Sequence, residues 1–529
     1  MSATRRKIEL YDTTLRDGAQ QTGLSYSIED RLRILHKIDQ LGVPFIEGGW
    51  PGANPRDTEF FKLATKETLQ HAALTSFGMT RKVGERAEDS AVLHELLETG
   101  TEVVCIVGKA WDLHVREALR TDLDEGVAMV RDSIAFLRGQ GRRVFFDAEH
   151  FFDGYGSDPG FAMRVLVAAE EAGAERLVLC DTNGGMLPFD VARIVGEVNT
   201  HVDSPLGIHV HNDAGCAVAN SLIAVEHGVY QVQGVVNGYG ERTGNADLIP
   251  IAANLVLKMD ADCLPDGAVE HLTDLAHYVA EVANVAPDSH QPYAGRYAFT
   301  HKAGLHASGI ARLEEAYEHV RPSSVGNHRG VVASDLGGAA TLRMKAEEFG
   351  VEMRDDAIGA ILDELKEREA HGYTFEVADA SLELLMRRAG GWEQPFFSIE
   401  SFRVHIEQRM EDAEDVLAEA TVKVVTNGTR HIESAEGQGP VGALDNALRK
   451  ALTNEYPALD DMTLEDYRVR VLDETVGTGA TVRVLIDTSN GEREWTTVGV
   501  SENIIEASWE ALVEAYLYGL LHPREDRQA

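Results

Sequence analysis

The stretch Gly207-Ile-His-Val-His-Asn-Asp213 (GIHVHND) begins as a short β-branched run and ends in polar residues, and the amphipathic segment Val218–Glu226 follows it. The same order of apolar run, polar or glycine-rich end and helical stretch recurs from residue 7 to about 260. The runs are Ile8–Tyr11, Val43–Glu47, Ala73–Phe77, Val103–Val107, Val144–Asp147, Leu177–Cys180, Gly207–Val210 and Val232–Val236. Eight strands that alternate with helices over about 250 residues predict an α/β fold, a closed (β/α)8 TIM barrel.

A doubly wound open sheet is the alternative for this pattern. It generally has fewer strands and a glycine-rich turn after the first strand. The turn after the first run here, DTTLRDG at 12–18, has no GxGxxG motif, which favours the barrel.

We divide the chain into three parts: a barrel over residues 1–285, helical linker subdomains over 286–395, and a C-terminal α/β domain over 396–529. The linker is helical and rich in glutamate, as in Ala339–Phe349 and Ala357–Arg368, with no series of strands.

The C-terminal part contains an internal repeat. The run ATVKV at 420–424 is echoed by ATVRV at 480–484, and an Asn-Gly pair follows each run, at 427–428 and 490–491. Asn-Gly is the commonest two-residue hairpin turn, so a second strand is expected after each pair. Helices are then expected over Val441–Leu452 and Ile504–Leu521. Such a repeated unit behind a barrel regulates or dimerises more often than it catalyses.

Composition narrows the choice of partners. The chain has 87 Asp plus Glu against 49 Lys plus Arg, a net charge of 49 − 87 = −38, which repels nucleic acid and anionic membranes. It has no run of about 18 apolar residues and no secretory signal after MSATRRK. Four cysteines give no disulfide framework and favour a cytoplasmic location. An anionic substrate therefore needs a metal or a local cluster of positive charge.

Polar side chains follow the predicted strands at their carboxyl ends, where the reactive groups of a barrel gather. His209 and His211 are two residues apart, which places both imidazoles on one face of a strand, at the barrel mouth. Asp17 is the natural third ligand of a metal site, and Asn245 could add an oxygen. Two satisfied core histidines are the alternative, but carboxylates at neighbouring strand ends favour the metal.

Two further side chains at the strand ends suit an anionic substrate. Arg16 can supply fixed donors to a developing oxyanion, and an ion pair with Glu47 or Asp12 is the alternative that is compatible with that role. Thr182 can offer a hydroxyl to a carboxylate or cap the helix after the sixth strand.

Three motifs identify a known family. DTTLRDG (12–18), HVHND with GCAVANS behind it (209–221), and GYGERTGNADL (238–248) together resemble the 2-isopropylmalate synthase, homocitrate synthase and citramalate synthase family of metal-dependent acyltransferases. The resemblance covers essentially the whole chain. HKAGLHASG (301–309) resembles the family's histidine-containing linker block, and GQGPV (437–441) resembles its allosteric domain.

The resemblance implies roles for these residues. Asp17, His209 and His211, with Asn245 near or in the shell, would hold a divalent metal (Mg, Mn or Zn) that chelates a 2-oxo acid and polarises its carbonyl. Arg16 would stabilise the alkoxide, and Thr182 would bind the substrate carboxylate. The family's acid–base group, matched by Glu149, His306 and Tyr317, would take a methyl proton from acetyl-CoA. Water would then release CoA. Because the family's linker reaches a neighbouring barrel, a homodimer or a higher homo-oligomer is implied.

The 2-oxo acid is predicted from a short stretch. GGWPGANP (48–55) resembles the citramalate synthase branch of the family, and AQQTG (19–23) departs from the more usual DGEQ continuation. This implies pyruvate as substrate, (R)-citramalate as product and isoleucine as the branched-chain amino-acid effector. Phe77 and Met79 either exclude a branched side chain or pack in the core. One methylene is worth only about 1–3 kcal/mol.

Three alternatives remain. A 2-isopropylmalate or homocitrate synthase would run the same chemistry on another 2-oxo acid. A metal-dependent carbon–carbon lyase commonly carries a cysteine in its glycine loop, which residues 238–244 lack. A non-enzymatic sensor would have no reason to retain Asp17, His209 and His211.

Overall fold

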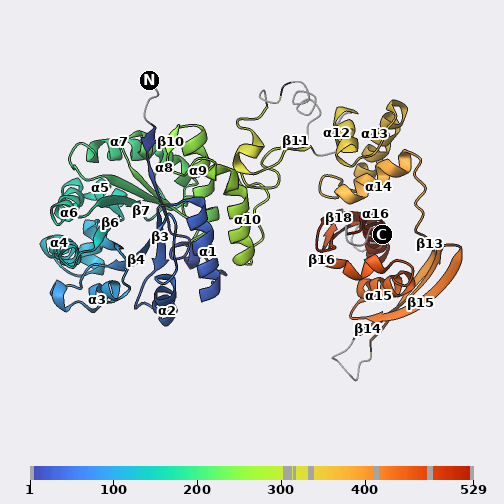
Figure 1. The fold of residues 1–529 in the computed structure, drawn as a ribbon, viewed down its shortest axis with the longest axis horizontal. Coiled ribbons are helices and arrows are strands. Elements are labelled where there is room, and N and C mark those ends of the chain that lie inside the picture. Colours follow the sequence, from blue (N-terminus) through green and yellow to red (C-terminus); the bar gives the residue numbers. More distant parts are fainter. Residues whose placement is uncertain are drawn as a thin grey trace. The chain divides into compact units, whose positions relative to one another are not determined.

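The computed structural model describes residues 5–301, 313, 317–331, 339–408, 416–472 and 480–524. Contacts divide the chain into two compact units, residues 1–299 with 320–329 and residues 300–319 with 330–529 (Figure 1). Among the described helices, none combines the length and apolar character that a bilayer crossing requires. The four cysteines are free, and the cytoplasmic location stays a prediction.

The first unit is the predicted (β/α)8 barrel. Its eight parallel strands follow one another in chain order, and β9 pairs with β2 to close the circle. This closure excludes the open sheet. The strands are β2 (Glu9–Asp12), β3 (Phe45–Gly49), β4 (Ala73–Met79), β5 (Val103–Lys109), β6 (Arg143–Glu149), β7 (Arg176–Asp181), β8 (Leu206–Val210) and β9 (Gln231–Gly234).

Helices lie between the strands around the barrel (Figure 1). The outward apolar side chains of the strands and the helices form one large buried cluster. Local signals set the helix ends: Ser27 and Asp30 form a capping box on α1, and Gly42 ends it at φ 94°. The helices are α1 (Ile28–Leu41), α2 (Pro55–Ala64), α3 (Ala91–Glu98), α4 (Leu123–Gly139), α5 (Phe151–Ser157), α6 (Pro159–Glu171), α7 (Pro188–Val198), α8 (Ala217–Glu226), α9 (Leu248–Leu257) and α10 (Leu272–Val282).

Aromatic rings fill part of the barrel interior. The ring centroids of Tyr11 and Phe45 are 6.2 Å apart, and those of Phe45 and Phe145 are 5.1 Å apart. All three side chains are buried. The barrel is therefore a packed core and not a pore, and its chemistry is confined to the mouth and to the side chains just inside it.

The second unit contains most of the predicted linker, whereas residues 286–299 and 320–329 belong to the first unit. Its predicted helices are confirmed as α12 (Ala339–Glu348) and α13 (Asp355–Ala370), and α14 (Asp379–Ala389) follows them. A short parallel pair, β11 (Thr300–His301) and β12 (Gly330–Val331), was not indicated by the sequence.

The internal repeat is confirmed, and each copy contains one strand more than predicted. Each copy is a three-stranded antiparallel sheet followed by a helix. The helices pack on their own sheets, and Val422, Leu448 and Ile486 belong to one core shared by both copies. The elements are β13 (Phe397–Gln408), β14 (Val416–Thr426), β15 (Thr429–Gly437) and α15 (Pro440–Leu452), then β16 (Thr463–Val471), β17 (Val482–Ser489), β18 (Glu494–Ser501) and α16 (Ile504–Leu521).

One of the two predicted hairpin turns is wrong. Asn427 and Gly428 form the expected two-residue turn between paired Thr426 and Thr429, with φ of 50° and 76°. In the second copy the loop spans residues 490–493. The Asn490 side chain accepts hydrogen bonds there from the N–H groups of Glu492 and Arg493 at 3.1 and 2.9 Å. Asparagine caps its own turn in this way, which lengthens the loop.

We therefore expect Asn490→Ala to destabilise the C-terminal domain more than Asn427→Ala. The first substitution removes a buried side chain and leaves the N–H groups of Glu492 and Arg493 without its oxygen, at a cost of about 0.5–1.5 kcal/mol for each hydrogen bond lost. The second removes an exposed asparagine from a turn that alanine adopts with a cost of about 1 kcal/mol. Calorimetry of the full-length variants measures both, and equal thermal midpoints would contradict this account.

Candidate metal centre

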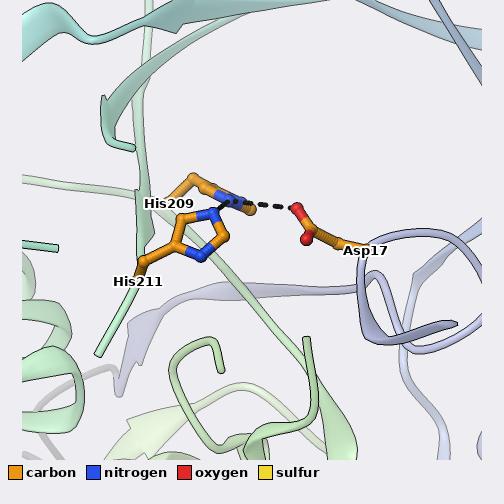
Figure 2. Close-up of side chains that lie close together, drawn as sticks. All are labelled: Asp17, His209 and His211. Carbon is orange, nitrogen blue, oxygen red and sulfur yellow. Dashed lines mark hydrogen bonds and ion pairs between the residues drawn. The ribbon is translucent and has the colours of Figure 1, made fainter. Parts of the chain in front are cut away.

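Three side chains converge at the barrel mouth. Asp17 lies in the loop after β2, His209 is on β8, and His211 follows the end of that strand. Figure 2 shows the three side chains pointing toward one another. One ligand atom from each lies within 4.8 Å of the others, and all three residues are buried. His209 Nε2 is 3.4 Å from both Asp17 Oδ2 and His211 Nε2.

The charges of this cluster suit a cation. Burial opposes the charge on Asp17, but Arg16, His209 and His211 lower its pKa to about 2. Burial lowers the pKa of His209 to about 4, although the Asp17 carboxylate opposes this shift. Burial also lowers the pKa of His211. One carboxylate and two neutral imidazoles at neutral pH are the protonation states that metal ligands require.

Asn245 supplies a test of whether these residues fit a metal. A bridge pairs it with His211, and its Nδ2 donates to Asp17 Oδ1 at 3.2 Å and to Tyr239 O at 3.1 Å. Its Oδ1 is buried and has no hydrogen-bond partner within the described ranges. A buried oxygen with an unused lone pair next to a carboxylate and two imidazoles fits a cation, and this N/O set suits Mg, Mn or Zn.

Arg16 lies beside the cluster and is held by two carboxylates. Its Nε donates to Glu47 Oε1, and its Nη1 is 3.0 Å from Asp17 Oδ2. Its guanidinium carbon lies 3.8 Å from the ring centroid of Phe77. Burial works against its charge, but Glu47 and Asp17 raise its pKa. The ion pair with Glu47 is thus present, and it fixes the guanidinium next to Asp17.

Thr182 lies in the loop after β7 and is not a helix cap, because the N-cap of α7 is Leu187. Its Oγ accepts a hydrogen bond from the His150 N–H at 2.9 Å, and its carbonyl accepts one from Arg242 Nη2 at 2.7 Å. Accepting this hydrogen bond uses one of the two Oγ lone pairs, and the hydroxyl hydrogen can be donated to another group.

Glu149 ends β6 and forms an ion pair with Lys109, which ends β5. Both residues line a cavity of about 530 Å³ at the ends of β3 to β6, together with Trp50 and Met79. Phe77 is buried and meets Trp50 edge to face with ring centroids 5.6 Å apart. Of the predicted linker residues, Tyr317 is 42% exposed and His306 lies outside the described residues.

Sequence reasoning missed two residues of this region. Lys109 lies at the end of β5. A basic residue directly after Gly108, at the end of a predicted strand, could have indicated it. The Oε1 of Gln233 lies 3.0 Å from His209 Nδ1. Two glutamines at alternate positions of a barrel strand, Gln231 and Gln233, point to the same face and could have indicated a polar role inside the barrel.

Comparisons with known proteins agree with this architecture. Residues 7–281 match the HMGL-like family, 294–372 the homocitrate synthase post-HMGL domain-like family, and 376–520 the LeuA allosteric (dimerisation) domain. The chain is 50% identical to the (R)-citramalate synthase of Synechocystis sp., over 98% of this chain and 97% of that one. It is 49% identical to that of Geobacter sulfurreducens, over 98% of both. It is 32% identical to a probable 2-isopropylmalate synthase of Methanopyrus kandleri, over 96% and 97%.

The buried histidine generates a prediction about acid stability. The pKa of His209 is about 4 in the folded protein and about 6.5 in an unfolded chain. Between these values the unfolded chain binds more protons, so the stability of the metal-free protein falls as pH falls from 6.5 to 4. We expect His209→Gln to lose less stability over this window, by up to about 3 kcal/mol.

Urea unfolding in EDTA at pH 7 and pH 4.5 measures the difference, with the surface variant His201→Gln as control. Equal losses in His209→Gln, His201→Gln and the parent protein would contradict a neutral buried His209.

Proposed function

The chain belongs to the HMGL-like family, and we propose that it is an acyltransferase that condenses acetyl-CoA with pyruvate to give (R)-citramalate and CoA in isoleucine biosynthesis. The cluster of Asp17, His209 and His211 beside Arg16 is the observation that carries the proposal. The chain is more similar to the (R)-citramalate synthases of Synechocystis sp. and Geobacter sulfurreducens than to the probable 2-isopropylmalate synthase, which supports pyruvate as the 2-oxo acid.

A divalent cation held by Asp17, His209 and His211, with Asn245 beside them, would supply Lewis-acid polarisation of the 2-oxo acid carbonyl. Arg16 would direct a donor toward the same carbonyl oxygen. Its Nε donates to Glu47 and its Nη1 donates to Asp17, and these two bonds fix the guanidinium. Its Nη2 makes no hydrogen bond to any residue the structure describes and is available to the oxyanion that develops there. Thr182 donates its hydroxyl hydrogen to the substrate carboxylate.

The carbon–carbon bond forms between the acetyl methyl carbon and the carbonyl carbon of pyruvate. A base removes one methyl proton, the carbonyl oxygen becomes the hydroxyl of the product, and water then cleaves the thioester to release CoA. We assign the base to Glu149, whose carboxylate lines the cavity at the mouth next to Lys109. His306 and Tyr317 complete the acid–base group, supplied by the linker of a second subunit.

We assign the selectivity for pyruvate to large side chains near Arg16 and in the cavity at the barrel mouth. Phe77 is buried beneath the Arg16 guanidinium, and Met79 lines the cavity with Trp50. We assign to these large side chains the exclusion of a branched substrate side chain, with room left for a methyl group. A difference of one methylene is worth about 1–3 kcal/mol, so such contacts are sufficient to shift the preference between related 2-oxo acids.

Turnover with acetyl-CoA tests the function directly. Release of the CoA thiol is measured with pyruvate, 2-oxoisovalerate and 2-oxoglutarate as separate substrates. We expect pyruvate to give the highest kcat/KM, and EDTA to abolish turnover until Mg²⁺, Mn²⁺ or Zn²⁺ is restored.

A preference for 2-oxoisovalerate or 2-oxoglutarate would assign the chain to 2-isopropylmalate or homocitrate synthesis instead. Turnover that is insensitive to EDTA would refute the role of the metal centre.

The C-terminal domain is proposed to dimerise and to bind isoleucine. Its match to the LeuA allosteric (dimerisation) domain supports this role, as do apolar side chains exposed on its sheets. Ile432 on β15 is 51% exposed, and Val471 on β16 is 50% exposed. Exposed apolar side chains on open sheets are typical of surfaces that a partner covers.

We expect Ile432→Asp to weaken the dimer and the inhibition by isoleucine, because it places a charge in a surface that association would bury. Light scattering after size exclusion measures the mass, and turnover with added isoleucine measures the inhibition. Ile504→Asp, at an exposed helix start, is the matched control. An unchanged dimer in Ile432→Asp would place the interface elsewhere.

A further inference from the structure

We propose that Gln233 and Asp147 are positioning residues that fix the tautomer of His209, so that its Nε2 lone pair faces Asp17. The proposal rests on the metal centre of the proposed function. It assigns a role to two polar side chains inside the barrel that are neither predicted metal ligands nor predicted substrate-binding residues. Both are almost completely buried, Gln233 at 0% and Asp147 at 3% exposure.

The two side chains form a continuous relay behind the ligand. Gln233 is on β9 next to β8, whose register places Gly207 beside Gln231 and Ile208 beside Val232. Its Oε1 is 3.0 Å from His209 Nδ1. Its Nε2 donates to Asp147 Oδ1, also at 3.0 Å, across the interior on β6. The order is therefore Asp147, Gln233, His209 and then Asp17, whose Oδ2 is 3.4 Å from His209 Nε2.

When Asp147 is ionised, the chemistry of each group leaves one arrangement of hydrogens. A carboxylate only accepts hydrogen bonds, so the Gln233 amide must turn its NH₂ toward Asp147 and its oxygen toward His209. The amide oxygen also only accepts, so His209 Nδ1 must carry the proton. The neutral imidazole then has its lone pair on Nε2, the atom that faces Asp17 and His211.

Asp147 is itself held in place to act on Gln233. The thiol of Cys105, which is completely buried, lies beside Asp147 and lowers the pKa of that carboxyl, which favours its charged form. No comparable support reaches the second histidine, because His211 Nδ1 is buried without a hydrogen-bond partner among the described residues. The relay is therefore specific to His209. An outer partner of this kind commonly raises metal affinity by orienting the ring and fixing its tautomer.

Binding of Mn²⁺ to the full-length protein tests the relay. We expect Gln233→Leu to weaken Mn²⁺ binding by roughly 10–100-fold, measured by the EPR signal of free Mn²⁺. Gln231→Leu is the matched control, because Gln231 is the same residue type, lies two positions earlier on β9 and is equally buried. Its Nε2 donates to Glu9 at 3.5 Å, and its side chain makes no hydrogen bond to His209 among the described residues. Burial and the Glu47 charge raise the pKa of Asp147 to about 7, so pH 8 keeps its carboxylate charged.

A second measurement reads the tautomer without metal. Long-range ¹H–¹⁵N spectra of ¹⁵N-histidine-labelled apoprotein, assigned with His209→Ala, report which ring nitrogen carries the proton. We expect protonated Nδ1 in the parent protein and a mixture of tautomers in Asp147→Asn, which frees the Gln233 amide to rotate. This variant carries the test if Gln233→Leu does not fold.

The results separate the two proposals. Equal Mn²⁺ affinity in Gln233→Leu, Gln231→Leu and the parent would overturn the relay, as would protonated Nε2 in the parent apoprotein. Absence of Mn²⁺ and Zn²⁺ binding in the parent would instead refute the metal centre, while the tautomer measurement would still decide the relay.

Discussion

Closure of the barrel is the constraint on which the site depends. Asp17 and Asn245 are more than 200 residues apart in the chain, yet the pairing of β9 with β2 makes the first and last loops neighbours. The two histidines reach the same place because β8 lies next to β9. An open sheet with the same strand order would leave β2, which precedes Asp17, and β9, which precedes Asn245, at opposite edges. The proposed ligands therefore come together because the barrel is closed.

Electrostatics explains how a chain of net charge −38 can receive an anion. The negative charges that repel an anion lie mostly on the exposed surface, where salt screens their field. At the mouth, the cations are few but buried or partly buried: Arg16 is held between Glu47 and Asp17, and Lys109 is paired with Glu149. These pairs leave little net positive charge by themselves. A bound cation would change the balance, which is why a metal rather than a basic patch suits this protein.

The sequence predicted the features that follow from local periodicity. His209 and His211 share a face because strand side chains alternate, and Asp17, Thr182 and Glu149 come at strand ends, which the pattern locates within a few residues. Partners across the barrel could not be predicted. The contact of Gln233 with Asp147 joins β9 to β6 and depends on strand stagger, which no local pattern encodes. The loop at Asn490 was also predicted wrongly. The Asn490 side chain accepts hydrogen bonds from later N–H groups of the loop, which favours a longer loop than the two-residue turn typical of Asn-Gly.

The polar content of the barrel interior argues that this layer serves the site at the mouth. Glu47, Asp147 and Gln233 are buried above a layer in which Tyr11, Phe45 and Phe145 pack as an ordinary core. Replacing a buried polar network by apolar side chains of similar volume is often neutral or stabilising. Stability alone therefore gives no reason to bury a carboxylate behind an amide. Each of these groups instead contacts a residue of the mouth: Glu47 contacts Arg16, and Gln233 contacts His209 while Asp147 holds it in place. The interior thus acts as the support that orients the ligands and the guanidinium, and its desolvation cost is offset by the apolar layer outside the strands.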